Sequence, residues 1–170
     1  KLARKPKPLP DLDMAQVDFD PPSGWEWSQL AEVGFISPRN SLSDEQQVAF
    51  VPMANVPAAY GEAVRAETRP WGEVKGGYTH FAEGDVGLAK ITPCFQNGKS
   101  AVFQDLPEQA GAGTSELHVC RPVLVDPYYL VVFLKSPYFI DNGIPRMTGT
   151  AGQKRVPSGY FSHTPLPLPP

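Results

Sequence analysis

Residues 84–103 (GDVGLAKITPCFQNGKSAVF) gather side chains that suit phosphate groups and nucleic-acid bases. Ammonium and hydroxyl groups bind phosphate oxygens, and the amides of glutamine and asparagine can pair with base edges. The candidates in this stretch are Lys90, Thr92, Gln96, Asn97 and Lys99. Taken alone, the stretch is more typical of a β-hairpin with a polar, solvated end, so the rest of the chain must decide between the two interpretations.

A second polar cluster occupies residues 148–155. Gly149 and Gly152 lie within it, and glycine allows the backbone to approach a ligand closely. Its basic and hydroxyl groups again suit phosphate contacts. The candidates in this second cluster are Thr148, Thr150, Gln153, Lys154 and Arg155. Arg39 and Asn40, in a separate polar loop, are weaker candidates.

Catalytic and metal-binding chemistry has less support. Residues 92–95 (TPCF) superficially resemble the catalytic motif of DNA methyltransferases, but no glycine-rich nucleotide or cofactor loop accompanies them. A cysteine nucleophile needs a histidine base, and Cys94 could pair with His80 or His118. The conceivable metal ligands lack zinc spacing, and they are His80, Cys94, His118, Cys120 and His163. We therefore expect no catalytic residue and no metal site.

The first cluster is predicted to lie on a hairpin. Val86 and Leu88 alternate with small residues, which is the period of two typical of a strand. Asn97-Gly98 predicts a tight type I′ turn, because that turn needs positive φ at both central residues. A return strand then runs to Phe103.

The remaining elements are short and separated by prolines and glycines. Asp126-Pro127 and Ser136-Pro137 each combine an N-cap with a proline at the first helical position, and they predict two consecutive helices that end at Asn142-Gly143. Glu62–Glu67 could form a short helix, and Gly72 suggests a loop. Strands are expected near residues 25–27, 35–37, 47–53, 78–81 and 114–121, with a helical turn ending at Gly34 and an extended tail (PLPLPP). The predicted class is α+β, a mixed and loop-rich β-sheet with short helices packed on it.

Composition is consistent with one domain of 170 residues, of which 41% are hydrophobic. The 20 prolines are spread through the chain and favour a loop-rich fold. No apolar run is long enough for a membrane span and no signal peptide opens the sequence, so the two cysteines are expected to be free thiols in a reducing cytoplasm. Because residue 1 is lysine, we expect the sequence to be a fragment.

Charge is unevenly distributed. The net charge is −3, which by itself disfavours a nucleic-acid-binding protein. Residues 11–89 hold four basic and 13 acidic residues, whereas residues 90–170 hold seven basic and five acidic residues. A local basic face on an acidic body is therefore compatible with the sequence.

Four stretches, in this order and spacing, resemble the target recognition domain of the specificity subunit of type I restriction-modification enzymes. They are GWEW with LAEVG at 24–34, GDVGLAKITPCFQNGKSAV at 84–102, GTSELHVCRP at 113–122, and GTAGQKRVP at 149–157 running into PLPLPP. The resemblance covers roughly residues 20–170. Gly87 departs from it, since a larger apolar residue is expected in that strand, and it predicts locally looser packing.

The resemblance implies a domain that recognises double-stranded DNA and reads one half of a bipartite site without being an enzyme. It implies partner modification and restriction subunits, with S-adenosylmethionine, ATP and magnesium bound only by those partners. We accordingly expect a Pro-rich linker over residues 1–22 and one recognition domain over 23–170 that ends before a spacer helix. A bacterial or archaeal cytoplasmic location is implied, and a homodimer is conceivable if the natural chain is a half subunit.

The two polar clusters acquire roles from this resemblance. Backbone contacts are expected from Lys90, Thr92, Lys99, Lys154 and Arg155, and base contacts from Gln96, Asn97 and Gln153, with Thr148 and Thr150 also at the DNA. Two alternatives stay open at this point. One is a small cytoplasmic enzyme that uses Cys94 and a histidine, and the other is a protein-interaction module whose partner binds the aromatic and Pro-rich ends.

Overall fold

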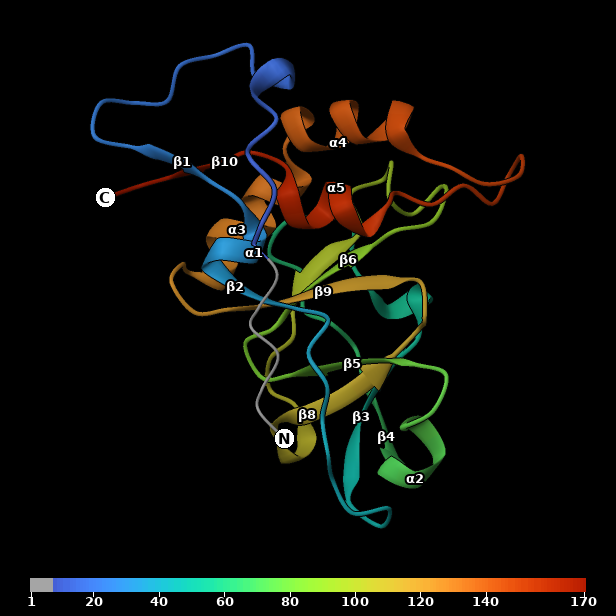
Figure 1. The fold of residues 1–170 in the computed structure, drawn as a ribbon. Coiled ribbons are helices and arrows are strands. Elements are labelled where there is room, and N and C mark those ends of the chain that lie inside the picture. Colours follow the sequence, from blue (N-terminus) through green and yellow to red (C-terminus); the bar gives the residue numbers. More distant parts are fainter. Residues whose placement is uncertain (1–7) are drawn as a thin grey trace.

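The structure, a computed structural model, describes residues 8–170 as an α+β fold (Figure 1). Two four-stranded sheets and a two-stranded ribbon form its frame, with strand orders β2-β9-β6-β7, β4-β3-β8-β5 and β1-β10. The strands are β1 (Glu26–Ser28), β2 (Gly34–Ile36), β3 (Gln47–Val51), β4 (Glu67–Pro70), β5 (Thr79–Ala82), β6 (Val86–Ala89), β7 (Ser100–Val102), β8 (Ala110–Gly113), β9 (Leu117–Pro122) and β10 (Leu166–Leu168).

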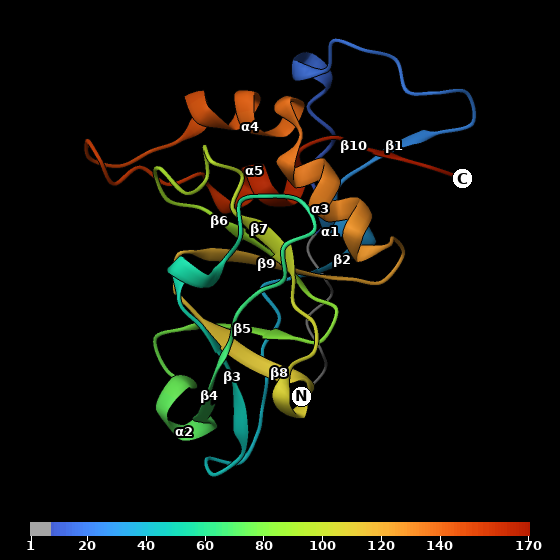
Figure 2. The same ribbon diagram turned by 180° about the vertical axis from the view of Figure 1, so that it is seen from behind.

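Helices cover the first of these sheets. Figures 1 and 2 show α3, α4 and α5 on one side of β6 and β9, whereas α2 lies beside the other sheet. The helices are α1 (Leu30–Val33), α2 (Trp71–Val74), α3 (Pro127–Lys135), α4 (Pro137–Gly143) and α5 (Ser158–His163), with 3₁₀ turns η1 (Met14–Gln16), η2 (Met53–Asn55), η3 (Pro107–Gln109) and η4 (Ile144–Arg146). The predicted α+β class with short helices on a mixed sheet is confirmed.

The two strongest helix predictions are also confirmed, and the caps act as expected. The Asp126 carboxylate accepts hydrogen bonds from the backbone N–H groups of Tyr128 and Tyr129 at the start of α3. The Ser136 hydroxyl accepts one from the Phe139 N–H at the start of α4. These bonds satisfy donors that a helix start leaves unpaired.

The hairpin is only partly as predicted. Strands β6 and β7 pair antiparallel with Val86 opposite Val102, as the alternation indicated. The type I′ turn is wrong, because β6 ends at Ala89, β7 begins at Ser100, and Asn97 does not have a positive φ. A long loop replaces the turn because the aromatic ring of Phe95 is fully buried against Phe139 of α4.

Several other predictions need correction. Glu62–Glu67 is not a helix, and β4 begins at Glu67. Gly72 lies in α2, since its neighbours Trp71 and Val74 are buried and hold that turn against the sheet. Helix α5 was not predicted. The strand at 47–53 is confirmed over Gln47–Val51, and the extended PLPLPP tail supplies β10, which pairs with β1.

The lead-in residues that the structure describes lie against the folded body. The Phe19 ring packs on Trp27 and Tyr138, each with ring centroids 5.3 Å apart. The Pro10 carbonyl accepts a hydrogen bond from the Gln29 side chain. The boundary at residue 22 stays a prediction, and residues 1–7 of the expected linker lie outside the described residues.

Gly87 has a packing reason. A side chain at this position would place its Cβ 2.6 Å from the Phe103 ring. Phe103 stacks on Phe81 of β5, with centroids 3.8 Å apart, and so joins the two sheets. The ring fills the space that the missing side chain leaves, and glycine does not loosen the packing here as the sequence suggested.

Candidate nucleic-acid interface

The two polar clusters lie side by side. We call residues 90–99 the hairpin loop and residues 148–155 the glycine loop; both project to the right in Figure 1 and to the left in Figure 2. The Thr92 N–H donates to the Lys154 carbonyl over 2.9 Å, and an antiparallel bridge joins Ile91 to Arg155. The Val156 N–H donates to the Lys90 carbonyl over 2.8 Å. Segments that are far apart in the sequence thus form one surface.

Six of the predicted contact residues are exposed on this surface. Their side chains make no hydrogen bond or ion pair to another group within residues 8–170, so their polar atoms face solvent. They are Gln96, Asn97, Thr148, Thr150, Gln153 and Lys154. Free amides and a free ammonium group are the groups that a nucleic acid can use without first breaking a protein contact.

Two predicted contact residues hold the loops instead. The Thr92 hydroxyl donates to the Gly152 carbonyl over 3.1 Å and accepts from the Lys154 N–H over 3.2 Å. The Lys99 ammonium donates to the Met53 carbonyl over 3.1 Å. Their side chains are partly buried and already have partners. A DNA contact for either residue stays a prediction, and the structure gives each a clear role in fixing loop shape.

Arg155 is also engaged. Its guanidinium forms two hydrogen bonds with Glu116, of 2.8 Å from Nε and 2.7 Å from Nη2. This bidentate pair lowers the pKa of Glu116 below its usual value and raises that of Arg155. A phosphate would have to compete with a carboxylate for this guanidinium, which weakens the case for Arg155 as a backbone contact.

A basic hollow lies beside the two loops. It has a volume of about 250 Å³, and none of the residues from the described part of the chain that line it is acidic. Lys90 and Arg39 stand on its wall, and neither forms an ion pair within residues 8–170. The neighbouring Asn40 differs, because its amide donates to the backbone carbonyls of Phe81 and Gly111 inside the fold. Of the two weaker candidates, only Arg39 is therefore available to an anion.

The proposed cysteine–histidine pairs are not formed. The His118 Nε2–H donates to the Val156 carbonyl over 2.9 Å, and burial lowers the pKa of this imidazole. Both nitrogens of His80 are taken by backbone groups, at Lys75 and Asn40. No hydrogen bond joins Cys94 to either imidazole within the described chain. The geometry therefore offers no activated thiolate.

Other classes of site are not evident either. Within residues 8–170, no group of three or more His, Cys, Asp or Glu side chains is placed to hold a metal ion. Burial raises the pKa of the Cys120 thiol to about 12, as expected for an unreactive core cysteine. None of the helices between residues 8 and 170 is long and apolar enough to cross a membrane.

Sequence reasoning missed two residues that shape this surface. Glu116 lies in the predicted strand at 114–121 and Lys135 in the first of the two predicted helices, and the sequence indicated no contact for either side chain. Lys135 donates hydrogen bonds of 2.8 Å to the carbonyls of Ala58 and Gly98, and so reaches the hairpin loop from α3. A lysine in the last turn of a helix is a known capping signal, but its partner across the fold cannot be read from spacing.

Comparison with known proteins gives two closely related curated relatives. The chain is 45% identical over 170 residues to the type I restriction enzyme EcoAI specificity subunit and to the EcoEI specificity subunit, both of Escherichia coli. Each match covers 98% of this chain and 29% of the relative. The chain thus spans less than a third of the length of these subunits. No family model matches the chain.

A solved structure shares the fold. The HsdS subunit from Thermoanaerobacter tengcongensis superposes with a TM-score of 0.69 over 92% of this chain and 41% of that chain, at 22% sequence identity. The similarity to type I specificity subunits that the four sequence stretches suggested is therefore confirmed at the level of sequence and of fold.

Proposed function

We propose that this chain, a homologue of one part of a type I restriction enzyme specificity subunit, recognises double-stranded DNA and reads one half of a bipartite target site. The observation that carries the proposal is the union of the hairpin loop and the glycine loop into one surface. On it, the side chains of Gln96, Asn97, Gln153 and Lys154 have no partner among residues 8–170. Amides suit base edges in the major groove, and ammonium groups suit phosphates.

The contacts divide by chemistry. Gln96 and Asn97 on the hairpin loop and Gln153 on the glycine loop read base edges. Lys154 binds the DNA backbone, as does Lys90 with Arg39 at the basic hollow. Support comes from the exposure of the three amides, Lys154 and Arg39. Lys90 is half-buried, and none of the described residues that line the hollow beside it is acidic. Thr148 and Thr150 add hydroxyl contacts to phosphate oxygens.

Catalysis is assigned to partner subunits. In this proposal the chain positions a modification subunit and a restriction subunit of the same system on DNA, and those partners bind S-adenosylmethionine, ATP and magnesium. The geometry around Cys94, His80 and His118 supports a non-catalytic role for this chain. Should the natural chain carry only one recognition domain, a homodimer would supply the second half of the reader.

Salt dependence of duplex binding tests the proposal. The affinity should fall steeply as salt rises, because phosphate contacts release counterions. Lys154→Ala should lower the magnitude of the log–log slope by about 1. Arg69→Ala is the matched control, because Arg69 is paired with Glu67 on β4 of the other sheet and should leave the slope unchanged.

Two results would contradict the proposal. The first is binding that does not depend on salt. The second is no binding to any duplex even when the modification subunit is present. If Lys154→Ala and the unaltered chain have equal salt slopes, Lys154 makes no phosphate contact and the glycine loop is not part of the interface. The hairpin loop would then still have to be tested.

A further inference from the structure

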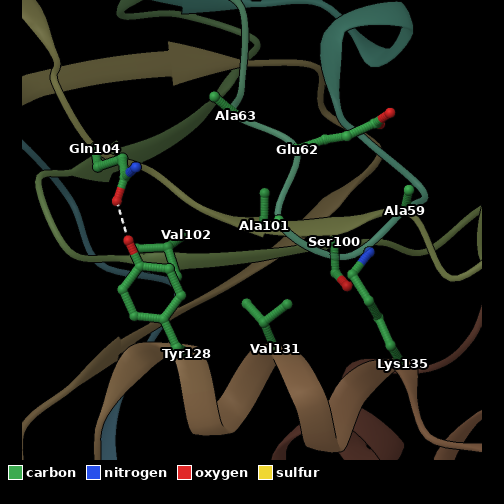
Figure 3. A pocket seen from close by; sticks show the side chains of 11 residues that line it. Ala59, Glu62, Ala63, Ser100, Ala101, Val102, Gln104, Tyr128, Val131 and Lys135 are labelled. Atoms are coloured by element: carbon green, nitrogen blue, oxygen red, sulfur yellow. Dashed lines mark hydrogen bonds between the residues drawn. The ribbon is translucent and has the colours of Figure 1, made fainter.

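The segment at residues 53–66 lies against the hairpin loop, and it packs on the core through Val56, which is buried, and through the partly buried Val64. After η2 it contains no helix or strand until β4, and Ala58–Ala63 are exposed. A hollow of about 160 Å³ separates it from β7 and α3, as Figure 3 shows. A second hollow, of about 330 Å³, lies between it and the residues Gln96–Gly98. Packing of Val56 and Val64 therefore leaves the exposed residues 58–63 and the loop beside them to be held by polar contacts.

Lys135 bridges the two. It is the last residue of α3, and Figure 3 shows its side chain extending from that helix toward Ala59 and Ser100. The ammonium group donates to the Ala58 and Gly98 carbonyls over 2.8 Å each and lies 3.5 Å from the Pro57 carbonyl. One charged group thus collects backbone acceptors from both segments, which gives hydrogen bonds stronger than neutral ones.

A second lysine strengthens the same junction from the other side. Lys99 belongs to the hairpin loop, and its ammonium donates to the Met53 carbonyl in η2. The adjacent Ser100 N–H donates to the Pro57 carbonyl over 3.2 Å. Residues 53–58 are therefore tied to the end of the hairpin loop by two ammonium groups and one backbone hydrogen bond.

Lys135 binds the hairpin loop next to the two side chains that are proposed to read DNA bases. Gly98 directly follows Gln96 and Asn97, the two amides proposed to read base edges, and it has a φ of +66°. Because the Gly98 carbonyl is bound by Lys135, the backbone that carries the Gln96 and Asn97 side chains is held in one conformation. Base reading by paired hydrogen bonds requires side chains that are held in place before the DNA arrives.

We propose that Lys135 is a positioning residue that fixes the hairpin loop for base reading without touching DNA. The inference rests on the proposed function, since it assigns a support to the same surface. Lys99 assists it through Met53. The sequence, by contrast, predicted a DNA-backbone contact for Lys99 and no role for Lys135.

Lys135→Met tests the inference, because methionine keeps an apolar stem and removes the donors. Without DNA, amide hydrogen exchange should accelerate about tenfold at residues 53–58 and 96–100 and stay unchanged in β9. With the target duplex, affinity should fall about tenfold while the salt slope stays the same, since no phosphate contact is lost. Lys154→Ala is the opposite control, with a lower slope and unchanged exchange.

The outcomes separate the inference from the proposed function. Unchanged exchange in Lys135→Met, or a slope lowered by about 1, would overturn the positioning role. If the unaltered chain binds no duplex but Lys135→Met still accelerates exchange, the proposed function is overturned, whereas the role of Lys135 in holding the loop stands. If Lys135→Met does not fold, as loss of protection in β9 would reveal, Lys99→Met applies the same test at residues 53–55, with a smaller acceleration expected.

Discussion

The hairpin loop and the glycine loop share one surface, but they are held in different ways. The hairpin loop contains a fully buried aromatic ring, that of Phe95, and its end is bound by Lys135 and Lys99. The glycine loop is exposed from residue 148 to 154. It is held by backbone pairing and the Arg155–Glu116 pair at its base, and by the Thr92 hydroxyl at Gly152. One loop is built into the core, and the other is attached to the surface.

The two kinds of anchoring suit different contacts with DNA. Base edges demand fixed donors and acceptors, and the anchored hairpin loop provides Gln96 and Asn97 in a defined position. Phosphates tolerate variation in approach, and the exposed glycine loop offers Lys154 on a flexible stem. We therefore expect substitutions in the hairpin loop to change stability and sequence preference together. In the glycine loop, substitution of Lys154 should change mainly the salt dependence, whereas substitution of Gln153, proposed to read a base edge, should change the sequence preference.

The largest expected effect is on stability. Phe95→Ala empties a fully buried site next to Phe139 and Gly143, and large-to-small changes of this kind cost about 3–5 kcal/mol. Denaturant unfolding measures this loss. Thr150→Ala on the exposed glycine loop is the matched comparison and should change the free energy of unfolding by less than about 0.5 kcal/mol. Similar losses for both variants would contradict the distinction between the loops.

A smaller effect concerns pH. Burial lowers the pKa of Lys135 to about 8, with Glu62 acting weakly in the other direction. Between that value and the ordinary lysine pKa of about 10.5, the unfolded chain binds a proton that the folded chain does not. The contribution of Lys135 to the free energy of unfolding should therefore rise with pH through this window and be lost as pH falls through 8.

Comparison with Lys135→Met isolates this contribution. The Cys120 thiol, with its raised pKa, acts in the opposite direction at high pH, but it does so equally in both chains. The difference in unfolding free energy between the unaltered chain and Lys135→Met should grow by about 1 kcal/mol from pH 7.5 to 10, a value reduced for partial exposure. A difference that stays constant would show that the ammonium is not desolvated at the junction.

The smallest stability effect belongs to the base of the glycine loop. Glu116→Gln removes the carboxylate that binds Arg155, and the loss of this partly exposed pair should cost about 1 kcal/mol or less. The freed guanidinium should then be able to meet a phosphate, so the salt slope of duplex binding should increase by up to about 1. Duplex titrations at several salt concentrations measure it. A decreased salt slope would contradict this expectation and would mean that the Arg155–Glu116 pair is needed to hold another residue at a phosphate.

The sequence predicted the helices and strands better than the tertiary contacts between them. Capped starts at Asp126 and Ser136 predicted two helices, because caps are local signals. The type I′ turn predicted at Asn97-Gly98 is wrong, because the burial of Phe95 against α4 overrides this local turn signal. Gly87 was interpreted as loose packing because its partner, Phe103, is distant in the sequence. Adjacency of the two polar loops and the reach of Lys135 depend on tertiary contacts that spacing does not encode.

The central claim is that the hairpin loop reads bases, and the sequence preference of bound DNA tests it most directly. Duplexes selected from a randomised pool by the chain, together with its modification subunit, should show a defined half-site. Asn97→Ala or Gln96→Ala should relax the preference at one position of that half-site and leave the salt slope unchanged. An identical selected sequence for the unaltered chain and for both variants would contradict the account.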